Sequence, residues 1–111
     1  MKLLLVALTA AALSVPAAAA DIARGATLTK TCVACHGADF NKPIDPSYPK
    51  LAGQHPDYLA HALTAYKRGN GVNGRNNPIM GAQVANLSDK DIVDIAAYLA
   101  SLPATIGTGH R

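Results

Sequence analysis

The sequence predicts a small all-α domain of three to four helices. Two stretches place apolar residues at i, i+3, i+4 and i+7, which is the spacing of one helical face. No stretch alternates apolar and polar residues as a half-buried strand does. The chain has 111 residues, one Phe and no Trp. A domain this short has a small core of its own, so a non-protein group is a candidate to fill part of it.

Composition excludes several classes of protein. The length excludes a multidomain enzyme, and two Cys are too few for a disulfide-rich scaffold. Lys and Arg total 10 against 7 acidic residues, but the basic residues are scattered along the chain. Without a basic run or stripe, we expect no nucleic-acid partner.

Residues 1–20 have the pattern of a secretory signal peptide. Lys2 provides the positive charge, residues 3–13 form the apolar run, and the alanines at 18–20 form a small-residue cleavage site. The run is shorter than the roughly 20 residues that cross a membrane. We therefore expect a mature domain of residues 21–111 in the periplasm, with no stable membrane anchor. An uncleaved anchor is the alternative.

Two helices have clear signals. One starts near Pro56, which suits a first helical turn, and ends at Gly69. The other follows Ser88, an N-cap with Asp91 three positions later, as in a capping box, and stops before Pro103. Their apolar stripes are Leu59, Ala62, Leu63 and Tyr66 in the former, and Ile92, Ile95, Ala96 and Leu99 in the latter.

Two further helical segments are weaker. Residues 21–34 have a narrow apolar face, and residues 78–85 suit a short helical turn. Between the helices, prolines and glycines predict a loop over 37–54, and glycines and asparagines predict a turn-forming segment over 69–77. The face of the first segment consists of Ile22, Gly25, Ala26, Thr29 and Val33.

The sequence Cys32-Val33-Ala34-Cys35-His36 carries the chemistry. Two Cys at this spacing in an exported protein form a redox disulfide, half of a zinc site, or a haem attachment. The adjacent His favours haem, because C-x-x-C-H is the attachment pattern of c-type haem. A thioredoxin-like motif needs strands, and a structural zinc site needs two more ligands. We expect thioethers at Cys32 and Cys35 and His36 as the proximal iron ligand.

The sixth iron ligand has several candidates. Met80 is the only Met after the leader and follows the turn-forming segment. His61 points away from the apolar stripe of its helix, and His55 stands beside Pro56 as a cap. We favour Met80. His55, His61 and an open iron site remain alternatives, and His110 lies in the tail.

On these motifs the chain resembles a small class I cytochrome c, nearest the single-haem c4/c5/c553-like group. The resemblance covers nearly all of residues 21–111. True c4 proteins have two haem domains, whereas one C-x-x-C-H is present here. The segments that carry it are Cys32-Val33-Ala34-Cys35-His36-Gly37, Tyr48-Pro49-Lys50-Leu51-Ala52-Gly53-Gln54, Asn77-Pro78-Ile79-Met80 and Leu87-Ser88-Asp89 with Ala97-Tyr98-Leu99.

The resemblance implies further roles for individual residues. The Pro49 carbonyl accepts a hydrogen bond from His36, Leu51 packs on the haem edge, and Arg75 meets a haem propionate. Gly25 and Tyr98 mark the contact between the first and last helices.

The predicted function is periplasmic electron transfer by one haem c with His/Met ligation, and not enzymatic catalysis. The expected partners are redox proteins such as a cytochrome complex, a dehydrogenase or a terminal oxidase, and we expect a monomer. One alternative is a haem subunit of a periplasmic dehydrogenase or flavocytochrome complex. Another is an open-site haem enzyme or gas-binding protein.

Overall fold

The computed structural model describes residues 18–105, so the predictions for residues 1–17 and for His110 lie outside the described residues. Within that range the fold contains five α-helices and one 3-10 turn, and it contains no strand. No helix of this part is long and apolar enough to span a membrane. The prediction of an all-α fold is confirmed. The helices are α1 (Ile22–Leu28), α2 (Val33–His36), α3 (Pro56–Arg68), α4 (Pro78–Val84) and α5 (Asp89–Ser101).

The expected count of three to four helices is too low, because the first predicted helix is interrupted. A 3-10 turn at Thr29–Thr31 separates α1 from α2. The Thr29 hydroxyl donates to the carbonyl oxygen of Ala26 at 3.1 Å. Such side-chain bonds to the backbone compete with the regular helical pattern. The chain therefore stays helical over most of this segment but changes pitch just before Cys32.

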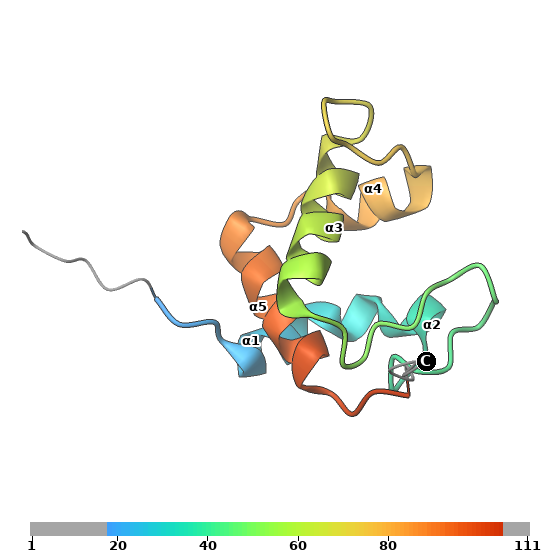
Figure 1. Ribbon diagram of the computed structural model, residues 1–111, viewed down its shortest axis with the longest axis vertical. Coiled ribbons are helices and arrows are strands. Elements are labelled where there is room, and N and C mark those ends of the chain that lie inside the picture. The colour runs from blue at the N-terminus through green and yellow to red at the C-terminus, as the bar shows by residue number, and fades with distance from the viewer. Residues whose placement is uncertain (1–17, 106–111) are drawn as a thin grey trace, which may run out of the picture.

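The other helix boundaries follow the sequence signals. Gly69 caps the end of α3 with φ of +55°. Ser88 and Asp91 form the predicted capping box at the start of α5, and the helix ends before Pro103. In Figure 1, α3 and α5 run side by side, α1 crosses α5, and α4 packs beside the end of α3.

The crossing of α1 and α5 depends on Gly25. A Cβ atom at this position would lie 2.1 Å from the carbonyl oxygen of Asp94 and 2.8 Å from Cβ of Tyr98. Only a residue without a side chain lets the two backbones approach this closely. The predicted contact of Gly25 and Tyr98 is confirmed. Ile22, which the sequence placed on the same face, is 49% exposed, so that part of the prediction is wrong.

The core is small and lies where α3, α5 and the loop after α2 meet. The predicted stripe of α5 is buried throughout, whereas on α3 Leu59 is buried and Leu63 and Tyr66 are half-buried. Phe40 is buried and packs edge-on against Tyr98, with ring centroids 6.3 Å apart. The core residues are Phe40, Ala52, Leu59, Ile95, Ala96 and Leu99.

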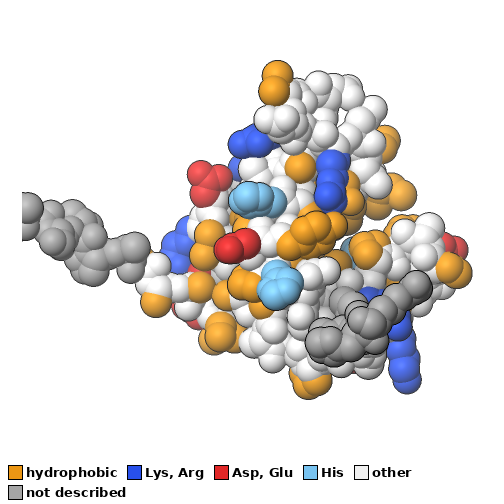
Figure 2. Space-filling model, in the orientation of Figure 1, with side chains coloured by type: hydrophobic (Ala, Val, Ile, Leu, Met, Phe, Trp, Pro, Cys, Tyr) orange, Lys and Arg blue, Asp and Glu red, His pale blue; other side chains and the backbone are white. Residues whose placement is uncertain are grey.

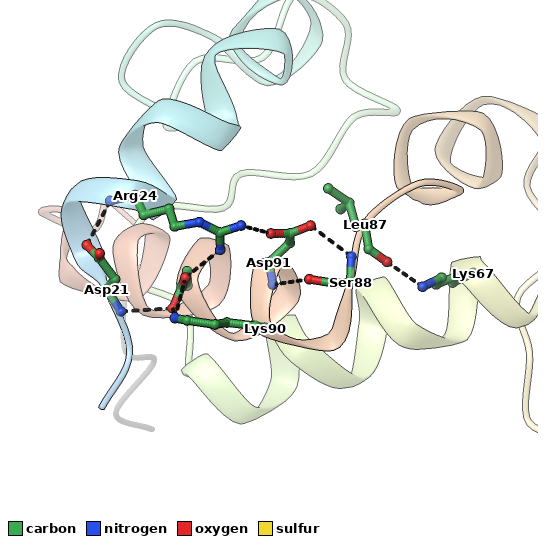
Figure 3. Close-up of polar contacts among 8 residues, drawn as sticks. Asp21, Arg24, Lys67, Leu87, Ser88, Lys90 and Asp91 are labelled. Atoms are coloured by element: carbon green, nitrogen blue, oxygen red, sulfur yellow. Dashed lines mark hydrogen bonds and ion pairs between the residues drawn. The ribbon is translucent and has the colours of Figure 1, made fainter. Parts of the chain in front are cut away.

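A polar cluster joins α1 to α5 beside this core (Figure 3). Asp94 is fully buried, and its carboxylate accepts hydrogen bonds from Arg24 Nη1 at 2.7 Å and from Lys90 Nζ at 2.9 Å. The backbone N–H of Asp21 donates to the same carboxylate at 2.8 Å, and Arg24 also pairs with Asp91. The Asp21 N–H, Lys90 and Arg24 hold the pKa of Asp94 far below its usual range.

Replacing Gly25 with Ala is expected to destabilise the protein. Overpacking costs about 1–3 kcal/mol, and the better helix propensity of Ala returns only roughly 0.5–1 kcal/mol. Denaturant unfolding of the haem-loaded proteins measures the difference in free energy of unfolding between Gly25→Ala and wild type. Thr27→Ala, at an exposed position of the same helix, is the control and should change stability by a few tenths of a kcal/mol. Equal stability of Gly25→Ala and wild type would contradict the close crossing.

Replacing Asp94 with Asn is expected to lower stability in a pH-dependent way. Because the folded pKa of Asp94 is depressed, its contribution is present above the unfolded pKa of about 3.9 and is lost as pH falls through the folded pKa. Unfolding free energies of both proteins from pH 7 down to pH 2 measure this. The difference between them should shrink only in strong acid. Asp57→Asn, at an exposed site in the first turn of α3, should show no comparable loss.

Candidate functional site

The C-x-x-C-H motif forms a single helical turn. Cys32 precedes α2, and its carbonyl oxygen accepts hydrogen bonds from the N–H groups of Cys35 at 3.3 Å and His36 at 3.0 Å. Residues three apart on a helix share a face, so the two thiols project to the same side. Both are half-buried and are not joined in a disulfide. Burial raises the pKa of the Cys32 thiol.

His36 is buried and is oriented by a backbone carbonyl. Its Nδ1 lies 2.8 Å from the carbonyl oxygen of Pro49, which is the contact that the resemblance implied. A carbonyl only accepts, so Nδ1 carries the proton and the lone pair of Nε2 is free to bind a metal ion. The ring also packs beside Tyr48, with centroids 6.2 Å apart. Tyr48 begins one of the segments that carry the resemblance, but its contact with His36 was not predicted.

Two unusual backbone conformations bring Pro49 to His36. Gly37 ends α2 with φ of +88°, and a Cβ there would lie 2.2 Å from the carbonyl oxygen of Lys42. Phe40 has φ of +56°, and its carbonyl accepts from the N–H groups of Leu51 at 2.9 Å and Ala52 at 3.2 Å. These bonds fold the predicted loop back onto α2. They also place Leu51 half-buried against the core.

Met80 lies in the first turn of α4. The side-chain oxygen of Asn77 caps this helix and accepts from the N–H groups of Ile79 and Met80, both at 3.0 Å. Pro78 occupies the first helical turn, where its missing N–H has no consequence. The Met80 side chain is half-buried. Figure 1 shows α4 and α2 on the same side of α3.

Arg75 is held against α3. Its guanidinium carbon lies 5.4 Å from the ring centre of Tyr66 and 5.9 Å from that of Tyr58, within cation–π range. Its backbone N–H donates to the carbonyl oxygen of Ala65 at 2.8 Å. Hydrogen bonding to the two tyrosines raises the pKa of Arg75. Arg75 therefore fastens the turn-forming segment 69–77 to α3.

His55 and His61, the two histidines of the α3 region, are both exposed. Figure 2 shows histidine side chains, in pale blue, at the surface of this face of the molecule. His61 points to solvent, as predicted. His55 occupies the N-cap position, but its side chain makes no capping hydrogen bond, so the prediction of a cap is correct in position and wrong in mechanism. The oxygen of the Gln54 side chain accepts from the His55 N–H instead.

The described residues fit a covalently attached haem. Two thiols lie one turn apart, and beside them an imidazole has one nitrogen free for iron. Apolar side chains stay half-buried next to the core and can pack on a large apolar ring. They include Leu28, Val33, Leu51 and Leu63. Within residues 18–105 there is no group of three or more His, Cys, Asp or Glu that could hold a metal ion.

Comparisons with known proteins point the same way. Residues 22–103 match the family model of cytochrome c. Cytochrome c-554(548) of Halomonas halodenitrificans is 45% identical over 83 residues, covering 75% of this chain and 98% of that protein. Cytochrome c4 of Pseudomonas aeruginosa is 44% identical over 90 residues, covering 81% of this chain but 42% of that protein.

A solved structure gives the same result. The crystal structure of reduced recombinant cytochrome c4 from Pseudomonas stutzeri has a TM-score of 0.72 and 40% identity, covering 80% of this chain and 49% of that one. The chain thus spans less than half the length of the cytochromes c4 that it matches here. It belongs to the cytochrome c family, whose cofactor is covalently bound haem c.

Proposed function

We propose that this chain is a soluble periplasmic electron carrier that holds one haem c between His36 and Met80. The observation that carries the proposal is the hydrogen bond from His36 Nδ1 to the Pro49 carbonyl, which leaves Nε2 with a free lone pair to bind a metal ion, next in the chain to Cys35. When bound, haem supplies the one-electron change between Fe(II) and Fe(III). The proposal assigns thioether attachment to Cys32 and Cys35.

Three residues outside the motif support the cofactor in this proposal. Pro49 fixes the tautomer and the plane of the His36 ring, as hydrogen-bond partners of metal-bound histidines do. Leu51 packs on the haem edge, in keeping with its half-buried position. Arg75 offers N–H groups to a propionate while Tyr58 and Tyr66 hold its guanidinium.

Met80 is the sixth ligand in this proposal. A thioether is a soft donor that raises the reduction potential of haem iron, which suits a carrier. The Asn77 cap and Pro78 fix the backbone around Met80. The competing histidines, His55 and His61, are both exposed, whereas Met80 is half-buried. If His36 and Met80 both bound the haem iron, neither a substrate nor a gas could bind it without displacing one of them, which favours a carrier over catalysis or gas binding.

The partners in this proposal are redox proteins such as a cytochrome complex, a dehydrogenase or a terminal oxidase. Electron transfer between such proteins uses small, weak interfaces. In this proposal the protein is a monomer that binds each partner only transiently, in keeping with such small interfaces. Stable co-purification with a large subunit would instead indicate the haem subunit of a dehydrogenase or flavocytochrome complex.

Met80→Ala is expected to retain covalent haem and to lose the carrier properties. The reduction potential should fall by on the order of 0.1 V, within the roughly 0.8 V range that axial ligands span. The weak far-red thioether-to-iron absorption band should disappear, and the reduced protein should bind CO. Visible spectra and a redox titration measure these changes.

The control for this experiment is Ile79→Ala. Ile79 is the exposed neighbour of Met80 under the same Asn77 cap, so the band and the potential should stay unchanged. If Met80→Ala leaves both unchanged and binds no CO, Met80 is not the ligand. If His55→Ala or His61→Ala removes the ligand instead, the His/Met assignment fails.

A periplasmic location requires export, and the proposed leader of residues 1–20 predicts that the exported protein begins at Asp21. Ala18, Ala19 and Ala20 are exposed and non-helical, as a segment entering a peptidase site must be. N-terminal sequencing of the haem-loaded protein from the periplasmic fraction tests this. A protein that still begins at Met1 would contradict the leader and favour a membrane-tethered form.

A further inference from the structure

The backbone nitrogen of Asp21 is directed at a buried carboxylate. It lies 2.8 Å from Oδ1 of Asp94, and Asp94 is fully buried. Arg24 and Lys90 donate to the same carboxylate from two further positions. In Figure 3 Asp21, Arg24 and Lys90 converge where α1 meets α5. Asp94 thus gathers N–H donors from the start of the domain and from both helices.

The groups near this nitrogen carry more negative than positive charge. Four carboxylates face two cations in the cluster, so a further positive charge at the Asp21 nitrogen would be stabilised by its surroundings. From the start of α1 come the Asp21 carboxylate and Arg24, and from α5 come Asp89, Lys90, Asp91 and Asp94.

Cleavage after Ala20 would supply that charge. Hydrolysis of the Ala20–Asp21 peptide bond consumes one water, leaves a carboxylate on Ala20 and frees an amine on Asp21. An α-amino group has a pKa of about 8, so it is protonated at neutral pH. The backbone of Asp21 is extended and the three preceding alanines are exposed. Their removal therefore takes no buried side chain from the fold.

We propose that Asp94 is the binding site for the α-ammonium group that leader cleavage creates at Asp21. The inference rests on the proposed leader. A neutral amide donor becomes a charged donor at the same place, and the hydrogen bond to the buried carboxylate becomes an ion pair. The new pair fastens the start of α1 to α5. Because α1 continues through Thr29–Thr31 into α2, processing also strengthens the support of the haem-attachment turn.

Two haem-loaded proteins with defined N-termini test the proposal. One begins at Asp21, and the other begins at Ala20, which moves the ammonium about 3.8 Å along the chain and keeps an amide at Asp21. Denaturant unfolding is measured from pH 6 to pH 9.5. Both proteins contain the same lysines, aspartates and haem ligands, so the titration of those groups cancels in the comparison.

The expected result has a definite sign. Pairing with Asp94 raises the folded pKa of the Asp21 ammonium, so its stabilisation is full below the unfolded pKa of about 8 and is lost as pH rises through the folded pKa. At pH 6 the unfolding equilibrium constant of the Asp21 protein should be about tenfold smaller than that of the Ala20 protein, which corresponds to one pKa unit. The ratio of the two unfolding equilibrium constants should approach one by pH 9.5.

Two further measurements make the result specific to Asp94. Asp94→Asn in both proteins should remove the difference between them. In the folded wild-type proteins, acetic anhydride at pH 8 should label the α-amine of the Asp21 form several-fold more slowly than that of the Ala20 form. Equal pH dependence and equal labelling of the two forms would overturn the proposal. An exported N-terminus other than Asp21 would overturn the predicted cleavage site and this proposal with it. Absence of the far-red band from the wild-type protein would contradict only the assignment of Met80.

Discussion

The close crossing of α1 over α5 is the contact on which the rest of the fold depends. At Gly25 the two backbones approach within a distance that excludes a Cβ atom. Beside that point Asp94 is buried with its charge compensated by N–H donors from both helices. An unpaired carboxylate in that position would be costly, so the crossing and the polar cluster require each other. Together they hold α1 against α5, and α1 continues through Thr29–Thr31 into the C-x-x-C-H turn.

The core of this chain is small, which suits a domain that also packs on a covalently bound cofactor. Six buried apolar residues form the core, and further apolar side chains remain half-buried around it. A chain of this size gains limited stability from its own packing. Haem adds a large apolar surface, and the thioethers keep it in place whatever the iron state. In the proposed function the cofactor would serve both as the redox centre and as part of the core.

The two sides of the proposed haem site are supported differently. His36 lies on a helical turn, and the loop that carries Pro49 is tied back by Phe40, whose carbonyl accepts two hydrogen bonds. Met80 follows the glycine-rich segment 69–77, which Arg75 fastens to α3. Several local hydrogen bonds therefore support the segment around His36. The segment that leads to Met80 is attached to α3 by fewer contacts, those of Arg75. We expect the methionine side to yield first under denaturing conditions.

The sequence by itself determined what depends on local pattern. Apolar periodicity, the Ser88 cap and the glycines and prolines between helices predicted α3, α4 and α5 to within a residue or two, and C-x-x-C-H predicted the chemistry. Only the tertiary structure placed Phe40 in the core, Tyr48 against His36 and the guanidinium of Arg75 against two tyrosines. The tertiary structure also buries Asp94. In the sequence Asp94 is one of several charged residues of its helix, and nothing marks it as buried. These positions depend on contacts between residues distant in the chain, and such contacts leave no mark on local periodicity.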